Sequence, residues 1–207
     1  MSVSNTSPKT MFQLSGREYA AATLSKSTLI IIDAQREYLS GPLALSGVQA
    51  AIDNIVKLVN AARAAKSPII HVRHLGTVGG MFDPQGERGK FVPEIEPLAD
   101  EIIIEKRLPN AMNGTVATDD GTTLNSLLVT RGHLDLVVCG FMSHSSVSTT
   151  VRAAKDYGFR CTLVEDACAT RDLPTPDGVI KAERVQQAEM AIMNDNFAKL
   201  ALTRDLI

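Results

Sequence analysis

The residue best placed to act as a nucleophile lies in a serine-rich segment that joins two predicted elements. The apolar run 134–139 predicts a buried strand that ends at Gly140, and the apolar residues after position 146 recur at helical spacing. We expect Ser146 at the helix start, where free backbone N–H groups and the helix dipole would favour an activated nucleophile and its oxyanion. Serine is also favoured there simply as a cap, a role for which Ser143 and Ser145 compete.

Two oppositely charged residues follow other predicted strands. Asp33 closes the β-branched run 27–34, and Lys106 closes the short run 102–106. The carboxylate of Asp33 would serve as a general acid or base, although aspartate at a strand end also caps turns. The Lys106 ammonium would pair with a carboxylate inside a pocket, or it would be a solvated strand end.

Strands and helices alternate along the chain, which predicts an α/β fold with a doubly wound, mostly parallel sheet and helices on both faces. We expect strands at 27–34, 69–74, 102–106, 134–139 and 161–164, a final edge strand at 198–202, and helices at 48–65, 122–131, 147–157 and 182–193. Residues 76–89 read as a long surface loop and 174–178 as a turn-rich break. Ligands of such sheets bind beyond the carboxyl ends of the strands, so Asp33, Lys106 and Ser146 are expected to converge.

Composition limits the classes of partner. The 207 residues carry a net charge of −2 with mixed signs, which argues against nucleic acid and membrane surfaces. No apolar run is long enough to span a bilayer, and the polar first ten residues show no secretory signal. Scattered cysteines at 139, 161 and 168 read as reduced thiols of a cytoplasmic protein. We expect an N-terminal arm over 1–25, which could dock on a neighbour through Phe12, Leu14 and Tyr19, and one domain over 26–207.

Three motifs in order carry a family resemblance. They are Asp33-Ala34-Gln35, the segment 105–111 (Glu-Lys-Arg-Leu-Pro-Asn-Ala), and the elbow 140–154 with Gly-x-x-Ser-x-x-Ser-Val-x-x-Thr-x-Arg-Ala-Ala. Together they resemble the isochorismatase-like cysteine hydrolases. The resemblance implies that Asp33, Lys106 and residue 146 are catalytic. It further implies an acyl- or carbamoyl-enzyme, a non-proline cis peptide near Phe141-Met142, and a homodimer or homotetramer.

Serine at position 146 departs from this family, in which the residue is usually cysteine. One explanation is that Ser146 replaces an original cysteine, so that the chain is an inactive form of an enzyme that cleaves a C–N bond in a small amide, ureide or carbamoyl compound. If serine is native, the chain is a slow serine hydrolase or an isochorismatase-type enzyme in which Asp33 protonates a vinyl ether. Arg73 and Arg107 are then candidates to bind an acidic substrate. A catalytically inactive binding protein is the third alternative.

Nine further residues are expected to contact substrate, although each could equally be structural: Gln35, Tyr38, His74, Phe82, Asn110, Met112, Phe141, Met142 and His144. The cluster His71, Arg73 and His74 invites metal ligation. Nicotinamidases of this superfamily bind a metal through an Asp-x-His…His arrangement, and neither histidine here has an aspartate two residues before it. We therefore expect neither a metal nor a cofactor, and no phosphate-binding glycine motif follows any predicted strand.

Overall fold

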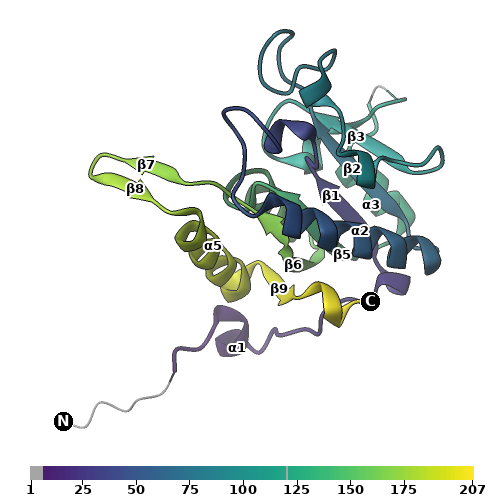
Figure 1. Ribbon diagram of the computed structural model, residues 1–207. Coiled ribbons are helices and arrows are strands. Elements are labelled where there is room, and N and C mark those ends of the chain that lie inside the picture. Colours follow the sequence, from purple (N-terminus) through teal and green to yellow (C-terminus); the bar gives the residue numbers. More distant parts are fainter. Residues whose placement is uncertain (1–6, 120) are drawn as a thin grey trace.

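A seven-stranded sheet forms the centre of the computed structural model, which describes residues 7–119 and 121–207 (Figure 1). The strand order is β4-β3-β2-β1-β5-β6-β9, and every neighbouring pair except β3 and β4 is parallel. The strands are β1 Thr28–Ile32, β2 Ile69–His74, β3 Ile102–Lys106, β4 Thr115–Val116, β5 Asp135–Phe141, β6 Arg160–Ala169 and β9 Ala198–Ala201. The chain winds outward from β1 to β3 and returns to β5 on the other side of β1, so the strand order switches between β1 and β5.

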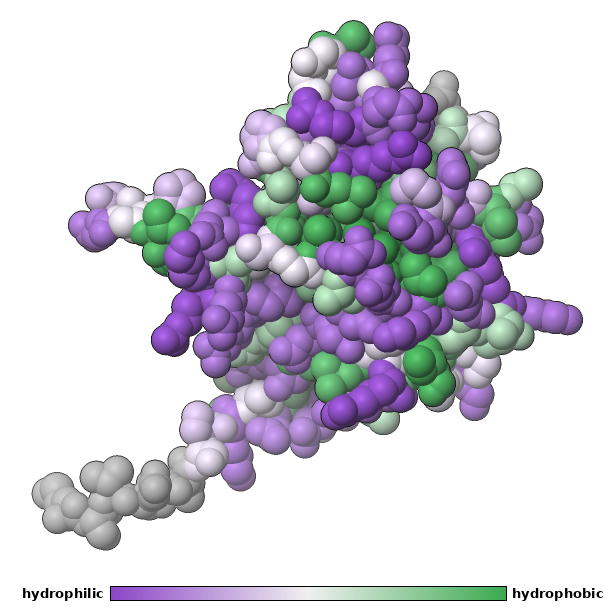
Figure 2. All heavy atoms as spheres, viewed as in Figure 1, coloured by the Kyte–Doolittle hydropathy of each residue, from purple (hydrophilic) through white to green (hydrophobic). Residues whose placement is uncertain are grey.

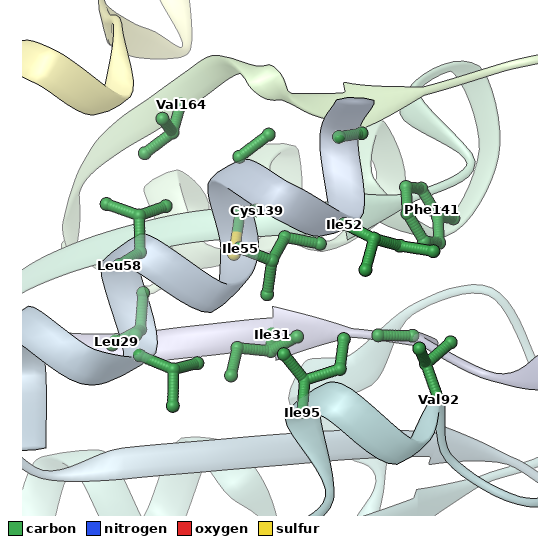
Figure 3. Packing of buried hydrophobic residues seen from close by; sticks show 14 of the residues in the cluster. Leu29, Ile31, Ile52, Ile55, Leu58, Val92, Ile95, Cys139, Phe141 and Val164 are labelled. Atoms are coloured by element: carbon green, nitrogen blue, oxygen red, sulfur yellow. The ribbon is translucent and has the colours of Figure 1, made fainter. Parts of the chain in front are cut away.

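Helices cover both faces of this sheet, and the predicted fold class is confirmed. On one face, the apolar stripe of α2 (Val48–Ala64) packs on Leu29 and Ile31 of β1, together with Cys139 and Phe141 of β5 (Figure 3). The alternate β1 residues Ile30 and Ile32 belong to the opposite core. That core also receives α3 (Leu124–Arg131), α4 (Ser148–Asp156) and α5 (Ala182–Asn196).

Burial on both faces explains why β1 is an unbroken apolar run rather than an alternating one. Each fully buried isoleucine contributes about 1.5–3 kcal/mol through removal of its side chain from water. The strands predicted at 69–74 and 102–106 have the predicted bounds, and the helix predicted at 48–65 ends one residue earlier.

Several local predictions were wrong or incomplete. The strand predicted to end at Gly140 continues to Phe141, and the helix predicted at 122–131 begins at Leu124. A π-helical turn over Ser143–Val147 precedes α4, so Ser146 lies inside this turn rather than at the start of an α-helix. β6 continues to Ala169 past a register shift opposite β5. The predicted break at 174–178 is an antiparallel hairpin of β7 (Leu173–Thr175) and β8 (Gly178–Ile180). The two-residue β4 had not been predicted.

The β7–β8 hairpin projects from the body of the protein, beyond the start of α5 (Figure 1). Val179 and Ile180 of this hairpin are exposed. In the space-filling view, hydrophobic residues lie on the hairpin and near the middle of an otherwise largely hydrophilic face (Figure 2). No helix in the described parts of the chain has both the length and the apolar character needed to cross a bilayer.

The described part of the N-terminal arm packs on its own chain. It contains a short helix, α1 (Met11–Ser15), which starts with a capping box at Thr10. The Tyr19 hydroxyl donates to the carbonyl of Cys161 at 3.0 Å, and the ring of Phe12 packs edge-on against Tyr19. Of the three residues expected to dock on a neighbour, Phe12 and Tyr19 therefore have partners within the chain, whereas Leu14 is exposed. The boundary of the arm at residue 25 stays a prediction.

Candidate active site

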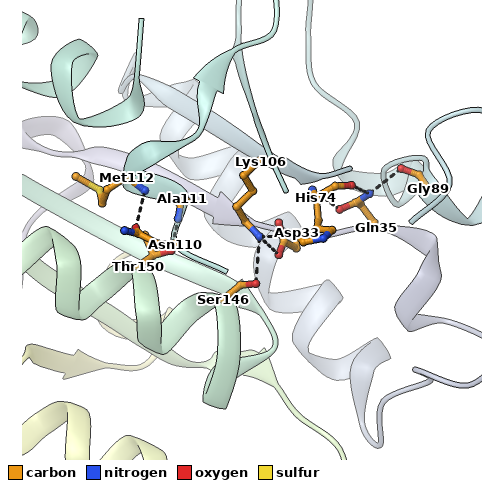
Figure 4. Close-up of polar contacts among 10 residues, drawn as sticks. All are labelled: Asp33, Gln35, His74, Gly89, Lys106, Asn110, Ala111, Met112, Ser146 and Thr150. Carbon is orange, nitrogen blue, oxygen red and sulfur yellow. Dashed lines mark hydrogen bonds and ion pairs between the residues drawn. The ribbon is translucent and has the colours of Figure 1, made fainter. Parts of the chain in front are cut away.

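Asp33, Lys106 and Ser146 meet at the carboxyl end of the sheet, as their positions after three different strands predict (Figure 4). Lys106 Nζ lies 2.7 Å from Asp33 Oδ2 and 3.1 Å from Ser146 Oγ. All three residues are buried. Asp33 follows β1 and Ser146 follows β5, so the group lies at the point where the strand order switches. The long side chain of Lys106 reaches it from β3, two strands away from β1.

Asp33 is held in an uncommon backbone conformation. Its φ angle is +50°, in the left-handed region that side chains other than glycine seldom adopt. One carboxylate oxygen, Oδ2, accepts from Lys106. The other, Oδ1, is buried and has no hydrogen-bond partner within residues 7–119 and 121–207. A buried carboxylate oxygen without a donor is costly, and it is available to a substrate or to a proton in transit.

A close approach between β1 and β5 shapes the elbow that carries Ser146. Gly140 has a φ of +119°, and a Cβ atom there would lie 2.1 Å from the carbonyl oxygen of Ile32. The peptide bond between Phe141 and Met142, one further along the chain, is cis, at the place the resemblance implies. The carbonyl of Met142 then accepts from the N–H groups of Ser145 and Val147. This turn brings Ser146 back over the end of β1.

The side chain of Gln35 is hydrogen-bonded to the backbone of two neighbouring segments. Its side-chain Nε2 donates to the carbonyls of His74 (3.0 Å) and Gly89 (2.8 Å), and its Oε1 accepts from the N–H of His74 (2.8 Å). The residue is fully buried. With these three contacts made to backbone, Gln35 joins the ends of β1 and β2 to the loop 76–91. These contacts give Gln35 a structural role, and its predicted contact with substrate stays a prediction.

Aromatic side chains pack beside the polar cluster. The ring centroids of Phe82 and His74 lie 4.9 Å apart. Phe82 also packs edge-on against Tyr38, which in turn packs edge-on against Phe141. Tyr38, Phe141 and Met112 are core residues with at most 2 % of their surface exposed, and their predicted contact with substrate stays a prediction. Burial also raises the pKa of Tyr38 well above its usual value, which keeps its hydroxyl protonated.

Asn110, His144 and Met142 each have contacts within the protein. Asn110 caps a short helical turn, since its Oδ1 accepts from the N–H of Met112 at 2.9 Å. His144 is half-buried and shares a hydrogen bond between its Nδ1 and the hydroxyl of Thr170. Burial lowers the pKa of His144, and the nearby Arg171 lowers it further. Met142 is half-buried and packs against the core on the α2 face. For Asn110, Met142 and His144, contact with substrate stays a prediction.

The His71–Arg73–His74 cluster separates into different environments. His71 Nε2 lies 2.8 Å from Glu101 Oε2, whereas Arg73 pairs with Glu105. His74 instead joins the Lys106 group, with its Nδ1 3.2 Å from Lys106 Nζ. Within the described residues, no three His, Cys, Asp or Glu side chains are grouped so that they could hold a metal ion.

Sequence reasoning missed two buried acids. Glu37 is fully buried, and its Oε2 accepts from the N–H of Phe82 at 2.9 Å. The carboxylate of Glu101 accepts hydrogen bonds from Nε and Nη2 of Arg63, at 2.7 and 2.9 Å, and also contacts His71. Phe82, Arg63 and His71 lie 30 to 45 positions away from these acids in the sequence. Only Glu37 could have been suspected from its place in the sequence, because it lies two residues after Gln35 in the segment that follows β1.

A carboxylate, an ammonium and a hydroxyl meet where the strand order of a mostly parallel α/β sheet switches. This arrangement is typical of hydrolases. The family model described as "Isochorismatase domain" matches residues 27–205. The chain belongs to the isochorismatase family.

Individual relatives agree with this assignment. The crystal structure of an isochorismatase from Pseudomonas putida KT2440 superposes with a TM-score of 0.91 at 63% identity, covering 97% of this chain and 100% of that one. The uncharacterized isochorismatase family protein YddQ of Bacillus subtilis is 36% identical over 86% of this chain and 96% of its own length. A streptothricin hydrolase of Streptomyces noursei is 30% identical over 77% of this chain and 61% of its own.

Proposed function

We propose that the chain has the active site of a hydrolase that cleaves a C–N bond in a small amide, ureide or carbamoyl compound, with residue 146 at the nucleophile position. The observation that carries the proposal is the Lys106 ammonium, which donates to both Asp33 Oδ2 and Ser146 Oγ inside a buried cluster. A nucleophile, a proton-transfer group and a cation at bonding distance are the parts that acyl transfer requires.

The reaction would proceed in two balanced steps. The side chain of residue 146 attacks the carbonyl carbon, its proton passes to the Asp33 carboxylate, and the oxyanion is held by backbone N–H groups of the elbow. The C–N bond then breaks, the amine leaves with the proton from Asp33, and an acyl- or carbamoyl-enzyme remains. Water, deprotonated by Asp33, hydrolyses this ester or thioester and regenerates the side chain. Throughout both steps, the hydrogen bonds from Lys106 would keep Asp33 and residue 146 close together.

Serine should make this site slow. A hydroxyl needs an adjacent base to become nucleophilic, and Lys106 as an ammonium donates to Ser146 Oγ rather than accepting from it. A thiol at the same place would ionise readily, because the neighbouring ammonium favours the thiolate. We therefore propose that Ser146 leaves the protein with little or no turnover and that the cluster suits a cysteine.

The streptothricin hydrolase relative supports hydrolysis as the activity, since its name is that of a hydrolase. The decisive experiment compares Ser146→Cys with the parent chain on a panel of primary amides, ureides and N-carbamoyl amino acids, with release of ammonia and intact protein mass as readouts. Ser145→Cys is the matched control, because it adds a thiol one residue away. We expect ammonia release and an acyl adduct for Ser146→Cys alone. Absence of both from Ser146→Cys would refute the proposal.

A second function, vinyl-ether hydrolysis of an isochorismate-like acid, is favoured by one observation. Asp33 Oδ1 is buried and lacks a donor within the described ranges, as an acid that protonates substrate directly would be. This reaction needs no nucleophile at position 146. Equal turnover of a vinyl ether by the parent, Ser146→Cys and Ser146→Ala chains would establish it. Binding of ligands without turnover by any of the three would instead identify a binding protein.

A further inference from the structure

We infer that His74 is a positioning residue of this site, which fixes the direction in which the Lys106 ammonium points. His74 Nδ1 lies 3.2 Å from Lys106 Nζ, which also contacts Asp33 Oδ2 and Ser146 Oγ. An ammonium has three N–H donors. Each of the three thus has an acceptor, and the third one removes the freedom to rotate about the Cε–Nζ bond.

This contact determines the state of the imidazole. Because the ammonium can only donate, Nδ1 must keep its lone pair, and the single ring hydrogen lies on Nε2. Burial lowers the pKa of His74, the charges of Lys106 and Arg107 lower it further, and the carboxylate of Asp33 opposes them. The ring is therefore neutral at pH 7, which is the state that the hydrogen bond from Lys106 requires.

The loop 76–91 keeps the imidazole in place. Gln35 pins the backbone of His74, and the ring of Phe82 lies 4.9 Å from the imidazole. Phe82 itself has a φ of +53°, and its N–H donates to Glu37 Oε2 at 2.9 Å. The other carboxylate oxygen of Glu37 lies 3.5 Å from Arg88. Glu37, a fully buried acid with no part in the proposed reaction, thus anchors the residue that packs on His74.

The arrangement can be tested without any activity. The chain has four histidines, so a long-range 1H–15N spectrum resolves each ring, and the signals lost in His74→Asn identify His74. We expect the Nε2–H tautomer and a pKa below 6.5, which rises in Lys106→Met through loss of the positive charge and in Phe82→Ala through entry of water. A ring with its hydrogen on Nδ1, or a titration that Lys106→Met leaves unchanged, would overturn the inference.

The kinetic part of the inference rests on the proposed function and is measured in the Ser146→Cys background. We expect His74→Leu to lower kcat at least about tenfold with KM within about twofold, since a hydrogen bond to a charged group is lost. His74→Asn, whose side-chain oxygen can accept from Lys106, should stay within about threefold of the parent. His133→Asn is the control, because His133 contacts Thr28 at the opposite end of β1.

Equal losses in His74→Leu and His74→Asn would show that the ring only fills space, and they would refute the positioning role. A Ser146→Cys protein that hydrolyses nothing would refute the proposed function instead. In that case the spectrum still decides whether His74 Nδ1 receives the Lys106 hydrogen bond.

Discussion

Lys106 Nζ lies 2.7 Å from Asp33 Oδ2, although 73 positions separate the two residues along the chain. Each side chain is only 1% exposed, so neither charge can be satisfied by water if the other is removed. The contact therefore joins the end of β1 to the end of β3 across β2.

We expect Lys106→Met to lower the free energy of unfolding by about 3–5 kcal/mol, because it leaves a buried carboxylate without its cation. Asp33→Asn in the same chain should restore part of this loss, since the orphaned charge is then gone. Urea denaturation measures both. Lys181→Met removes an exposed ion pair with Asp172 and should have little effect. Equal losses in Lys106→Met and Lys181→Met would contradict the prediction.

Gly140→Ala should prevent folding or destabilise the protein severely. The added methyl group would lie 2.1 Å from the carbonyl oxygen of Ile32, in backbone that cannot move without separating β1 from β5. Gly132→Ala is the matched control. Gly132 also has a positive φ, of +69°, but among the described residues, apart from Gly132 itself and its two chain neighbours, no atom lies within 4 Å of its Cβ position. It should cost only about 1 kcal/mol, the penalty for the backbone conformation alone. Thermal unfolding distinguishes the two.

Stability should depend on pH through Glu101. Burial by itself would raise the pKa of this carboxyl, but hydrogen bonds from Arg63, the N–H of Leu98 and His71 outweigh it and lower the pKa to about 2. A lowered pKa in the folded state gives stability that is present above the unfolded value of 4.5 and is lost as the pH falls toward about 2.

Glu101→Gln should therefore be less stable than the parent at pH 7, by about 2 kcal/mol after allowance for solvent screening. The difference in the free energy of unfolding between Glu101→Gln and the parent should shrink progressively between pH 5 and pH 3. Below this range we expect acid unfolding to prevent the measurement. Parallel urea titrations across this range provide the measurement. A difference that is constant with pH would show that the Glu101 charge is not what matters.

Thiol chemistry should single out position 146. Burial raises the pKa of Cys161 and Cys168 to about 12 and that of Cys139 well above its usual value, so the folded parent chain should react only slowly with iodoacetamide near pH 7. Ser146→Cys should add one fast site, with a half-maximal rate below pH 8.5 because Lys106 favours the thiolate. Adding Lys106→Met should move that midpoint upward. A fast reaction in the parent chain would contradict this account.

The sequence predicted the architecture well where one physical signal dominated. The strand predicted at 27–34 could be read because β1 is covered on both faces and its buried run of isoleucines is unbroken. The strands at 69–74 and 102–106 could be read from the isoleucines at their starts, although both end in charged or polar residues. The convergence of Asp33, Lys106 and Ser146 followed from their places after parallel strands. The β7–β8 hairpin was missed because Pro174, Pro176 and Gly178 resemble a loop, and its strands have only three residues each.

The parts of the site that escaped prediction depend on contacts between distant segments. The sequence predicts that Gln35 contacts substrate. Only the fold shows that its side-chain amide donates to the carbonyl of Gly89, 54 positions away. The π-helical turn around Ser146 could not be distinguished from an ordinary helix start, because serine suits both. Nothing near Glu37 in the sequence indicates that Phe82 is its partner.

The contrast between positions 140 and 146 bears on how such a site can be altered. At Gly140 the backbone of β1 leaves no room for a side chain, whereas the hydroxyl of Ser146 contacts the end of the Lys106 side chain. A substitution at position 140 has to displace backbone, whereas a substitution at position 146 has only to be accommodated by a neighbouring side chain. A change at Gly140 should therefore be paid for in folding, and a change at Ser146 in the chemistry that we propose for this site.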